Sequence, residues 1–103
     1  MKVLYVNIER YVVCLENCSL RHIESLAMIG LAEKAETIDC EKENFQRIIL
    51  HLVNGKTVTS ECFYYEEIKQ SLKIINMYIE FARKTNLLRE LTIVESWEKL
   101  PSE

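Results

Sequence analysis

The chain has 103 residues, of which 49% are hydrophobic, and this is enough apolar material for one domain with a core rather than a disordered chain. The formal net charge is -3 and there is no run of lysine and arginine, which argues against a protein that binds duplex nucleic acid. No apolar segment is long enough to cross a bilayer, so we expect a soluble protein.

The N-terminus bears on the cellular compartment. Residues 1–13 carry charges at Glu9 and Arg10 and lack the small-residue cleavage site of a signal peptide. We therefore expect a cytoplasmic protein in which residues 1–103 form a single domain. In that compartment the four cysteines are expected to be reduced thiols.

The N-terminal third combines strand-like and helix-like patterns. Residues 2–8 are rich in Val, Leu, Tyr and Ile on both faces, which predicts a strand covered on both sides, and residues 11–15 repeat the pattern. The two segments are interpreted as a hairpin, or alternatively as one long bent strand. Residues 19–35 predict a helix, with Ser19 as a candidate N-cap and apolar residues at helical spacing: Leu20, Ile23, Leu26, Ala27 and Leu31. Ile29-Gly30 weakens the second half of this pattern, and a strand over residues 21–29 remains the alternative.

The next segments predict β-structure. Residues 36–44 are polar and hold at most a brief strand at 37–40. Residues 45–53 and 56–63 flank Asn54-Gly55, the dipeptide that best fits a type I′ turn, because both positions accept a positive φ. A two-residue loop places three pairs of residues opposite each other: Val53 and Lys56, His51 and Val58, and Leu50 and Thr59. The first strand is apolar on both faces and is expected in the interior of the sheet, and the second is polar and is expected nearer an edge.

Residues 66–85 predict the one long helix of the domain. At about 100° per residue, a narrow stripe faces a core: Ile68, Leu72, Ile75, Ile79 and Ala82. The opposite side is polar: Lys69, Lys73, Asn76, Glu80 and Arg83. Ile74, Met77, Tyr78 and Phe81 fall on neither side and widen the apolar arc to about 200°, roughly twice what packing against one surface needs. We call these four residues the apolar shoulder, and either the rest of the chain or another chain must cover it.

The ends of this helix also fit its dipole. Glu66 and Glu67 suit the positive N-terminus, Arg83 and Lys84 suit the negative C-terminus, and Asn86 can end the helix. Residues 91–97 predict a last strand or a tail packed on the helix. The fold class is therefore α+β, with a mainly antiparallel sheet of four or five strands, the long helix at 66–85 packed on it, and a possible second helix at 19–35.

The segments IILHLVNGKTVTSECFYYEEI (residues 48–68) and SLRHIESL (residues 19–26) resemble small β-rich bacterial proteins such as the FlbD-like flagellar family. A strand, an Asn-Gly-Lys turn, a second strand and a helix with an acidic start recur there. The resemblance covers about a third of the chain and implies a strand rather than a helix over residues 20–29. This chain has a longer insertion at residues 30–44 and a longer terminal helix, and the resemblance carries no function over.

Cysteine and histidine spacing offers a metal or nucleophile site. Cys14, Cys18 and His22 would line one face of a continuous helix, although Cys14 belongs to a strand-like run, and Cys40 and Cys62 are isolated. Cysteine is also among the most often buried residue types. A nucleophilic cysteine would need a neighbouring histidine, and neither His22 nor His51 is placed next to a thiol by the sequence. We predict no catalytic residue, no metal and no cofactor.

Two further clusters admit a functional interpretation. The acidic residues at 33–43 lie in a polar connection and fit a solvated loop, or a surface for a basic partner: Glu33, Glu36, Asp39, Glu41 and Glu43. The aromatic residues could stack on single-stranded nucleic acid, but few basic residues lie among them, so core and interface positions fit them better: Tyr5, Tyr11, Phe45, Phe63, Tyr64, Tyr65 and Trp97.

These observations predict a small, non-enzymatic protein-interaction module. It is expected to self-associate as a homodimer through Ile74, Met77, Tyr78 and Phe81. An adaptor, a regulator, or an inhibitor encoded by a virus or mobile element would all fit. The first alternative is a nucleic-acid-associated regulator that binds through lysines and arginines brought together by folding, and the second is a metal- or thiol-redox protein.

Overall fold

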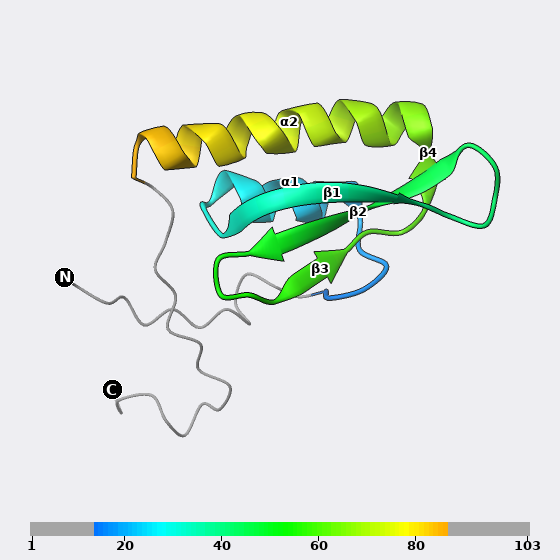
Figure 1. Cartoon of the computed structure of the whole chain (residues 1–103), viewed down its shortest axis with the longest axis horizontal. Coiled ribbons are helices and arrows are strands. Elements are labelled where there is room, and N and C mark those ends of the chain that lie inside the picture. The colour runs from blue at the N-terminus through cyan, green and yellow to red at the C-terminus, as the bar shows by residue number, and fades with distance from the viewer. Residues whose placement is uncertain (1–13, 87–103) are drawn as a thin grey trace, which may run out of the picture.

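The computed structural model describes residues 14–86 (Figure 1). In chain order the elements are α1 (Leu20–Met28), β1 (Ala32–Asp39), β2 (Phe45–Leu52), β3 (Thr57–Thr59), β4 (Phe63–Tyr64) and α2 (Tyr65–Lys84). The strands form one antiparallel sheet in the order β1-β2-β3, and β4 also pairs with β2. The α+β class, the small antiparallel sheet and the long helix are thereby confirmed. The strands predicted at residues 2–8 and 91–97 lie outside the described residues, as do residues 11–13 of the strand predicted at 11–15.

Helix α1 begins where the sequence predicts and ends earlier. The Ser19 hydroxyl accepts the His22 N–H over 3.1 Å, which confirms Ser19 as the N-cap. The helix stops at Met28 because Gly30 adopts a φ of 86°. The Gly30 N–H then bonds to Ala27 O and the Leu31 N–H to Leu26 O, which closes the last turn as a Schellman motif. The helix predicted to reach residue 35 is thus too long, and the alternative strand over residues 21–29 is wrong.

Strand β1 replaces the second half of the predicted helix. It runs over Ala32–Asp39, whereas the sequence predicted only a brief strand at 37–40. Its residues AEKAETID favour strands weakly, and the strand forms because it pairs along almost the whole length of β2, from Ala32 opposite Leu52 to Asp39 opposite Gln46. Tertiary pairing therefore decides the conformation of this segment.

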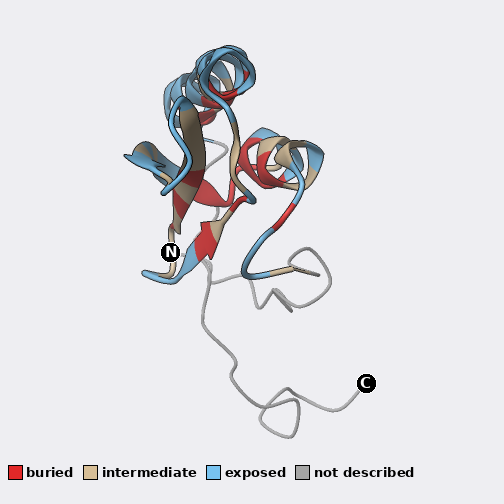
Figure 2. Ribbon diagram, turned by 90° about the vertical axis from the view of Figure 1, so that its right-hand side faces the viewer, coloured by how far each residue is buried: buried red, intermediate tan, exposed pale blue. Residues whose placement is uncertain are grey.

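The core lies between the sheet and the two helices. Figure 2 shows α1 and α2 on the same side of the sheet, with the buried residues gathered between them. The largest contributions are fully buried aliphatic side chains from β2 and both helices: Ile48, Leu50, Leu52, Ile23, Leu26, Ile68 and Ile75. Alternate residues of β2 carry this core, as expected for a strand with one face on the helices.

The hairpin after β2 has a different loop from the one predicted. The Leu52 N–H bonds to Lys56 O over 2.8 Å, so residues 53–55 form a three-residue loop. Gly55, with a φ of 88°, supplies the left-handed residue that this loop requires. His51 therefore lies opposite Thr57, and Leu50 opposite Val58, one residue away from the predicted register. The prediction of β2 as an interior strand is confirmed, since β1, β3 and β4 all pair with it.

Strand β3 is short because its partners change at Ser60. The buried Ser60 hydroxyl accepts the Ile48 N–H over 2.8 Å in place of a ladder carbonyl. On its other side β3 meets the segment before α1, where Cys18 N–H bonds to Thr59 O and Thr59 N–H bonds to Leu15 O. Leu15, the last residue of the strand predicted at 11–15, belongs to no strand but does line this edge.

Helix α2 follows the predicted bounds to within one residue. Its core stripe is buried at Ile68, Ile75, Ile79 and Ala82 and half-buried at Leu72. The five residues predicted on the polar side are all exposed. After Lys84 the chain turns at Asn86, which has a φ of 56°, in agreement with its predicted role as a stop.

Candidate functional site

Three of the four residues of the apolar shoulder face solvent. Met77 is 65% exposed, Phe81 is 59% exposed and Ile74 is 39% exposed, while Tyr78 is half-buried and packs against the core. They stand at positions i, i+3, i+4 and i+7 of α2, so they form a continuous stripe along the helix. The predicted interface residues therefore share one apolar surface.

A groove of about 290 Å³ adjoins the shoulder between α1 and α2. It is lined by residues of both helices and by one residue of β4: Leu20, Glu24, Glu67, Gln70, Ser71, Ile74 and Phe63. The buried Ser71 hydroxyl donates a hydrogen bond to Glu24. Glu24 and Glu67 give the groove a negative charge, so a basic side chain would be its electrostatic complement.

The charges of α2 are segregated by end. Glu66 and Glu67 lie in its first turn, and Arg83 and Lys84 lie in its last turn. All four side chains are exposed, although Arg83 also donates to the Glu33 carbonyl over 2.8 Å. The apolar shoulder, at residues 74–81, thus lies on a helix with a negative N-terminal end and a positive C-terminal end.

The four cysteines form two disulfides, so the expectation of reduced thiols is wrong in this structure. Cys14 pairs with Cys18, whose Cα atoms are 5.7 Å apart, and Cys40 pairs with Cys62 at a Cα separation of 6.3 Å. Cys40 follows β1 and Cys62 precedes β4, and both of these strands pair with the start of β2. Cysteines 22 positions apart meet only through this sheet register, which spacing in the sequence does not reveal.

The three residues considered as a metal site take separate roles. Cys14 and Cys18 are joined to each other, and the backbone N–H of His22 donates to the Ser19 hydroxyl that caps α1. No group of three or more His, Cys, Asp and Glu side chains in residues 14–86 is arranged to hold a metal ion.

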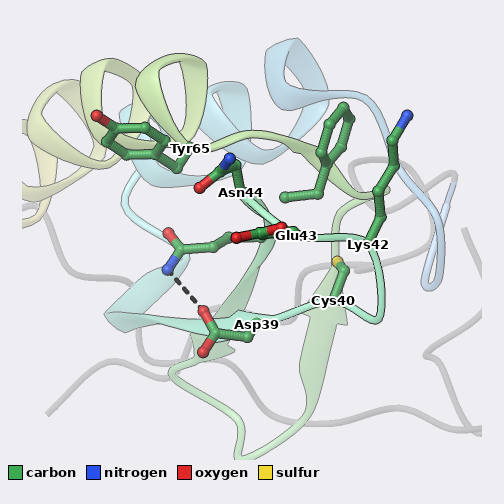
Figure 3. A pocket seen from close by; sticks show the side chains of 8 residues that line it. Asp39, Cys40, Lys42, Glu43, Asn44 and Tyr65 are labelled. Atoms are coloured by element: carbon green, nitrogen blue, oxygen red, sulfur yellow. Dashed lines mark hydrogen bonds between the residues drawn. The ribbon is translucent and has the colours of Figure 1, made fainter.

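An open hollow of about 440 Å³ lies where the β1–β2 turn meets the start of α2 (Figure 3). It is lined by charged, polar and aromatic residues around one cysteine: Asp39, Cys40, Lys42, Glu43, Asn44, Phe45, Gln46 and Tyr65. The Lys42 ammonium sits 4.5 Å from the centre of the Phe45 ring, a cation–π contact. Gln46 donates a hydrogen bond to Asp39 over 2.9 Å. The hollow is therefore lined by both positively and negatively charged side chains.

Tyr64 and Tyr65 form a small aromatic cluster with Phe45 at the hollow. The rings of Phe45 and Tyr64 meet edge to face at 6.1 Å, and those of Tyr64 and Tyr65 lie 5.2 Å apart. Phe63, which belongs to the same set of aromatic residues in the sequence, packs on the core instead. Tyr5, Tyr11 and Trp97 lie outside the described residues.

The acidic residues considered in the sequence spread along β1 and the turn that follows it. Glu33, Glu36 and Asp39 belong to β1. His51, on the neighbouring strand, forms a hydrogen bond with Glu36. This hydrogen bond lowers the pKa of the Glu36 carboxyl below its ordinary value of 4.5, and the charge of Lys34 lowers it further.

No protein-family model, curated protein or solved structure matches this chain. Neither helix in residues 14–86 is both long and apolar enough to span a membrane. Function therefore has to be inferred from the surfaces and contacts of the described residues.

Proposed function

We propose that this chain is a non-enzymatic, cytoplasmic protein-interaction module that self-associates as a homodimer through the apolar shoulder. The observation that carries the proposal is the exposure of Met77 and Phe81, at 65% and 59%, one helical turn apart on α2. Each large apolar side chain that leaves water on association contributes about 1.5–3 kcal/mol. A stripe of this kind on a small domain is typical of an interaction site.

A second copy of the same helix is the partner that this surface fits best. A straight stripe at i, i+3, i+4 and i+7 can pack on an identical stripe around a two-fold axis, which is the commonest symmetry of protein dimers. In an antiparallel pair, the acidic first turn of one α2 approaches the basic last turn of the other. The charges at the two ends of the helix therefore favour the antiparallel arrangement.

The test is the solution mass of the full chain under dilution, measured by size-exclusion chromatography with light scattering. The wild-type chain should run as a dimer that dissociates on dilution. Met77→Glu should raise the dissociation constant at least about tenfold, because a carboxylate would be buried without a partner. Asn76→Glu introduces the same side chain on the polar side of the same helix turn and should leave the dimer intact.

Thermal melting followed by circular dichroism shows whether a variant weakens the dimer or unfolds the monomer. Met77 is exposed, so Met77→Glu should leave the monomer folded, with helical circular dichroism unchanged. A wild-type chain that runs as a monomer at every concentration would contradict the proposal. Equal dissociation constants for Met77→Glu and Asn76→Glu would place the dimer interface elsewhere and contradict it as well.

A further inference from the structure

An arginine side chain donates a hydrogen bond to one of the two sulfurs of the Cys40–Cys62 disulfide. Arg47, on the central strand β2, donates a hydrogen bond from Nη2 to Cys62 Sγ over 3.2 Å. Arg47 and Cys62 are both half-buried, so solvent screens this contact less than it would screen a contact at the open surface. A cation beside a cysteine sulfur stabilises its thiolate. Cys62 is therefore the better leaving group when this disulfide is cleaved.

The other cysteine of this disulfide, Cys40, lines the hollow at the start of α2. Cys40 is half-buried and lines this hollow of about 440 Å³, and Figure 3 shows it among the charged and polar side chains there. Lys42 can pair with a carboxylate, and Asp39 and Glu43 can pair with an ammonium group. A small thiol that carries both groups matches the lining, and it would approach the disulfide from the side of Cys40.

We propose that the Cys40–Cys62 disulfide is a thiol–disulfide exchange site for a small zwitterionic thiol of the glutathione class. The thiolate of the small molecule attacks Cys40 Sγ and forms a new S–S bond. The bond between Cys40 and Cys62 breaks, and its electron pair leaves with Cys62 as a thiolate beside Arg47. The products are a mixed disulfide on Cys40 and a free Cys62 thiolate, so no further oxidant or reductant is consumed.

An exchangeable disulfide would reconcile the proposed cytoplasmic location with the two disulfides, which contradict the reduced thiols expected there. Disulfides are rare in the cytosol, and those that occur there are usually transient and redox-sensing or catalytic. Cysteines that pair in the fold of a cytoplasmic chain are therefore expected to exchange with the thiol pool. The Cys14–Cys18 disulfide provides an internal reference, because Cys18 is 1% exposed and belongs to the hydrophobic core.

The experiment follows exchange on the full, air-oxidised chain with excess reduced glutathione at neutral pH. Aliquots are alkylated with N-ethylmaleimide in acid, and peptide mass spectrometry locates the adducts over time. Glutathione should appear on Cys40 and maleimide on Cys62. Arg47→Gln should slow this step about threefold to tenfold, the range expected when a leaving thiolate loses a neighbouring cation. Arg47→Lys should restore most of the rate, and Arg21→Gln, at an exposed site on α1, should leave it unchanged.

A comparison of glutathione with 2-mercaptoethanol tests whether the side chains of the hollow bind the small thiol. Lys42→Gln should slow exchange with glutathione and leave exchange with 2-mercaptoethanol unchanged, because only glutathione carries carboxylates. Exchange at Cys14–Cys18 should be the same in every chain. Three results would each overturn the proposal. They are a glutathione adduct on Cys62 instead of Cys40, an exchange rate of Arg47→Gln equal to that of the wild type, and an air-oxidised chain that lacks the Cys40–Cys62 bond. The adduct position is read on the wild-type chain and does not depend on how well a variant folds.

Discussion

Glu36 and His51 meet on the face of the sheet that points away from the helices. Glu36 lies opposite Ile49 and His51 lies opposite Lys34, so the pair is diagonal across β1 and β2. Leu50, between Ile49 and His51 in the sequence, points into the core, and side chains alternate along a strand. The hydrogen bond from His51 favours the ionised form of Glu36 and so links the pairing of these two strands to pH.

The sign of this link can be predicted. The pKa of Glu36 is lowered in the folded chain, so the stabilisation is fully present above the ordinary value of 4.5 and is lost as the pH falls through the lowered value. Glu36→Gln removes the ionisable group. The stability advantage of the wild type over Glu36→Gln should therefore be present at neutral pH and shrink toward zero in acid. Urea unfolding at a series of pH values measures it.

Glu80→Gln is the control for this experiment, because Glu80 is an exposed residue on the polar side of α2. Its difference from the wild type should not follow the same acid transition. An advantage over Glu36→Gln that stays constant as the pH falls below 4.5 would show that the hydrogen bond with His51 does not favour the charged carboxylate.

At the scale of elements, the β2–β3 turn depends on one glycine. Gly55 has a φ of 88°, and a Cβ added there would meet no atom within 4 Å. A loss of stability in Gly55→Ala would therefore come from the left-handed backbone and not from a clash, and we expect about 1–2 kcal/mol. Chemical unfolding of the two chains measures this difference.

Gly55→Asn is the matched variant, because asparagine tolerates the left-handed region better than other residues do. It should lose clearly less stability than Gly55→Ala. Equal losses for the two variants would mean that the backbone conformation at this position is not what the turn requires.

The same elements show why part of the fold could be predicted. The start of α1 and the end of α2 follow from local signals, the Ser19 cap and Asn86, each of which acts within a few residues. The end of α1, just before Gly30, was predicted too late, at residue 35. The hairpin follows from Asn54-Gly55, but its register does not. The Val53 N–H donates to Leu31 O, which lies far away in the sequence. With Val53 bonded there, the loop has three residues instead of the predicted two.

Other features required partners that lie far away in the sequence. The segment 32–39 contains two alanines and four charged residues, and it becomes a strand because β2 lies beside it. The disulfide between Cys40 and Cys62 depends on the same register, as does the contact of Arg47 with Cys62. The apolar shoulder could be predicted because helical periodicity alone places its four residues on one side of α2.

On the scale of the whole molecule, the apolar shoulder and the acidic groove lie next to each other. In an antiparallel pair of α2 helices centred on the shoulder, Ile74 of one copy lies opposite Phe81 of the other. Lys84 of the second copy then lies opposite Ser71 of the first, an offset of about 6 Å along the helix axis from Glu67. Glu67 lines the groove together with Glu24, so the basic last turn of the partner copy would be received by an acidic surface.

A charge swap tests this arrangement. Glu67→Lys and Lys84→Glu should each weaken the dimer about threefold to tenfold, because an attraction becomes a repulsion. The double variant should return to within about twofold of the wild type, since the pair is restored with opposite signs. Lys69→Glu, on the polar side of α2, is the control for a change of net charge. The dissociation constants are measured by sedimentation equilibrium at low and high salt.

The outcomes separate the arrangement from the association itself. If the single variants weaken the dimer and the double variant restores it, and salt reduces both effects, the helices pair in the antiparallel sense. If the double variant is at least as weak as the single ones while Met77→Glu still gives monomers, the shoulder is the interface but the two helices do not pair in this register. Each single variant also replaces a charge that is favourable at its end of the helix, and this change lowers the stability of the monomer. The double variant carries both unfavourable charges, so it does not recover this stability. Thermal melting of each variant therefore measures this effect on the fold separately from the effect on the dimer.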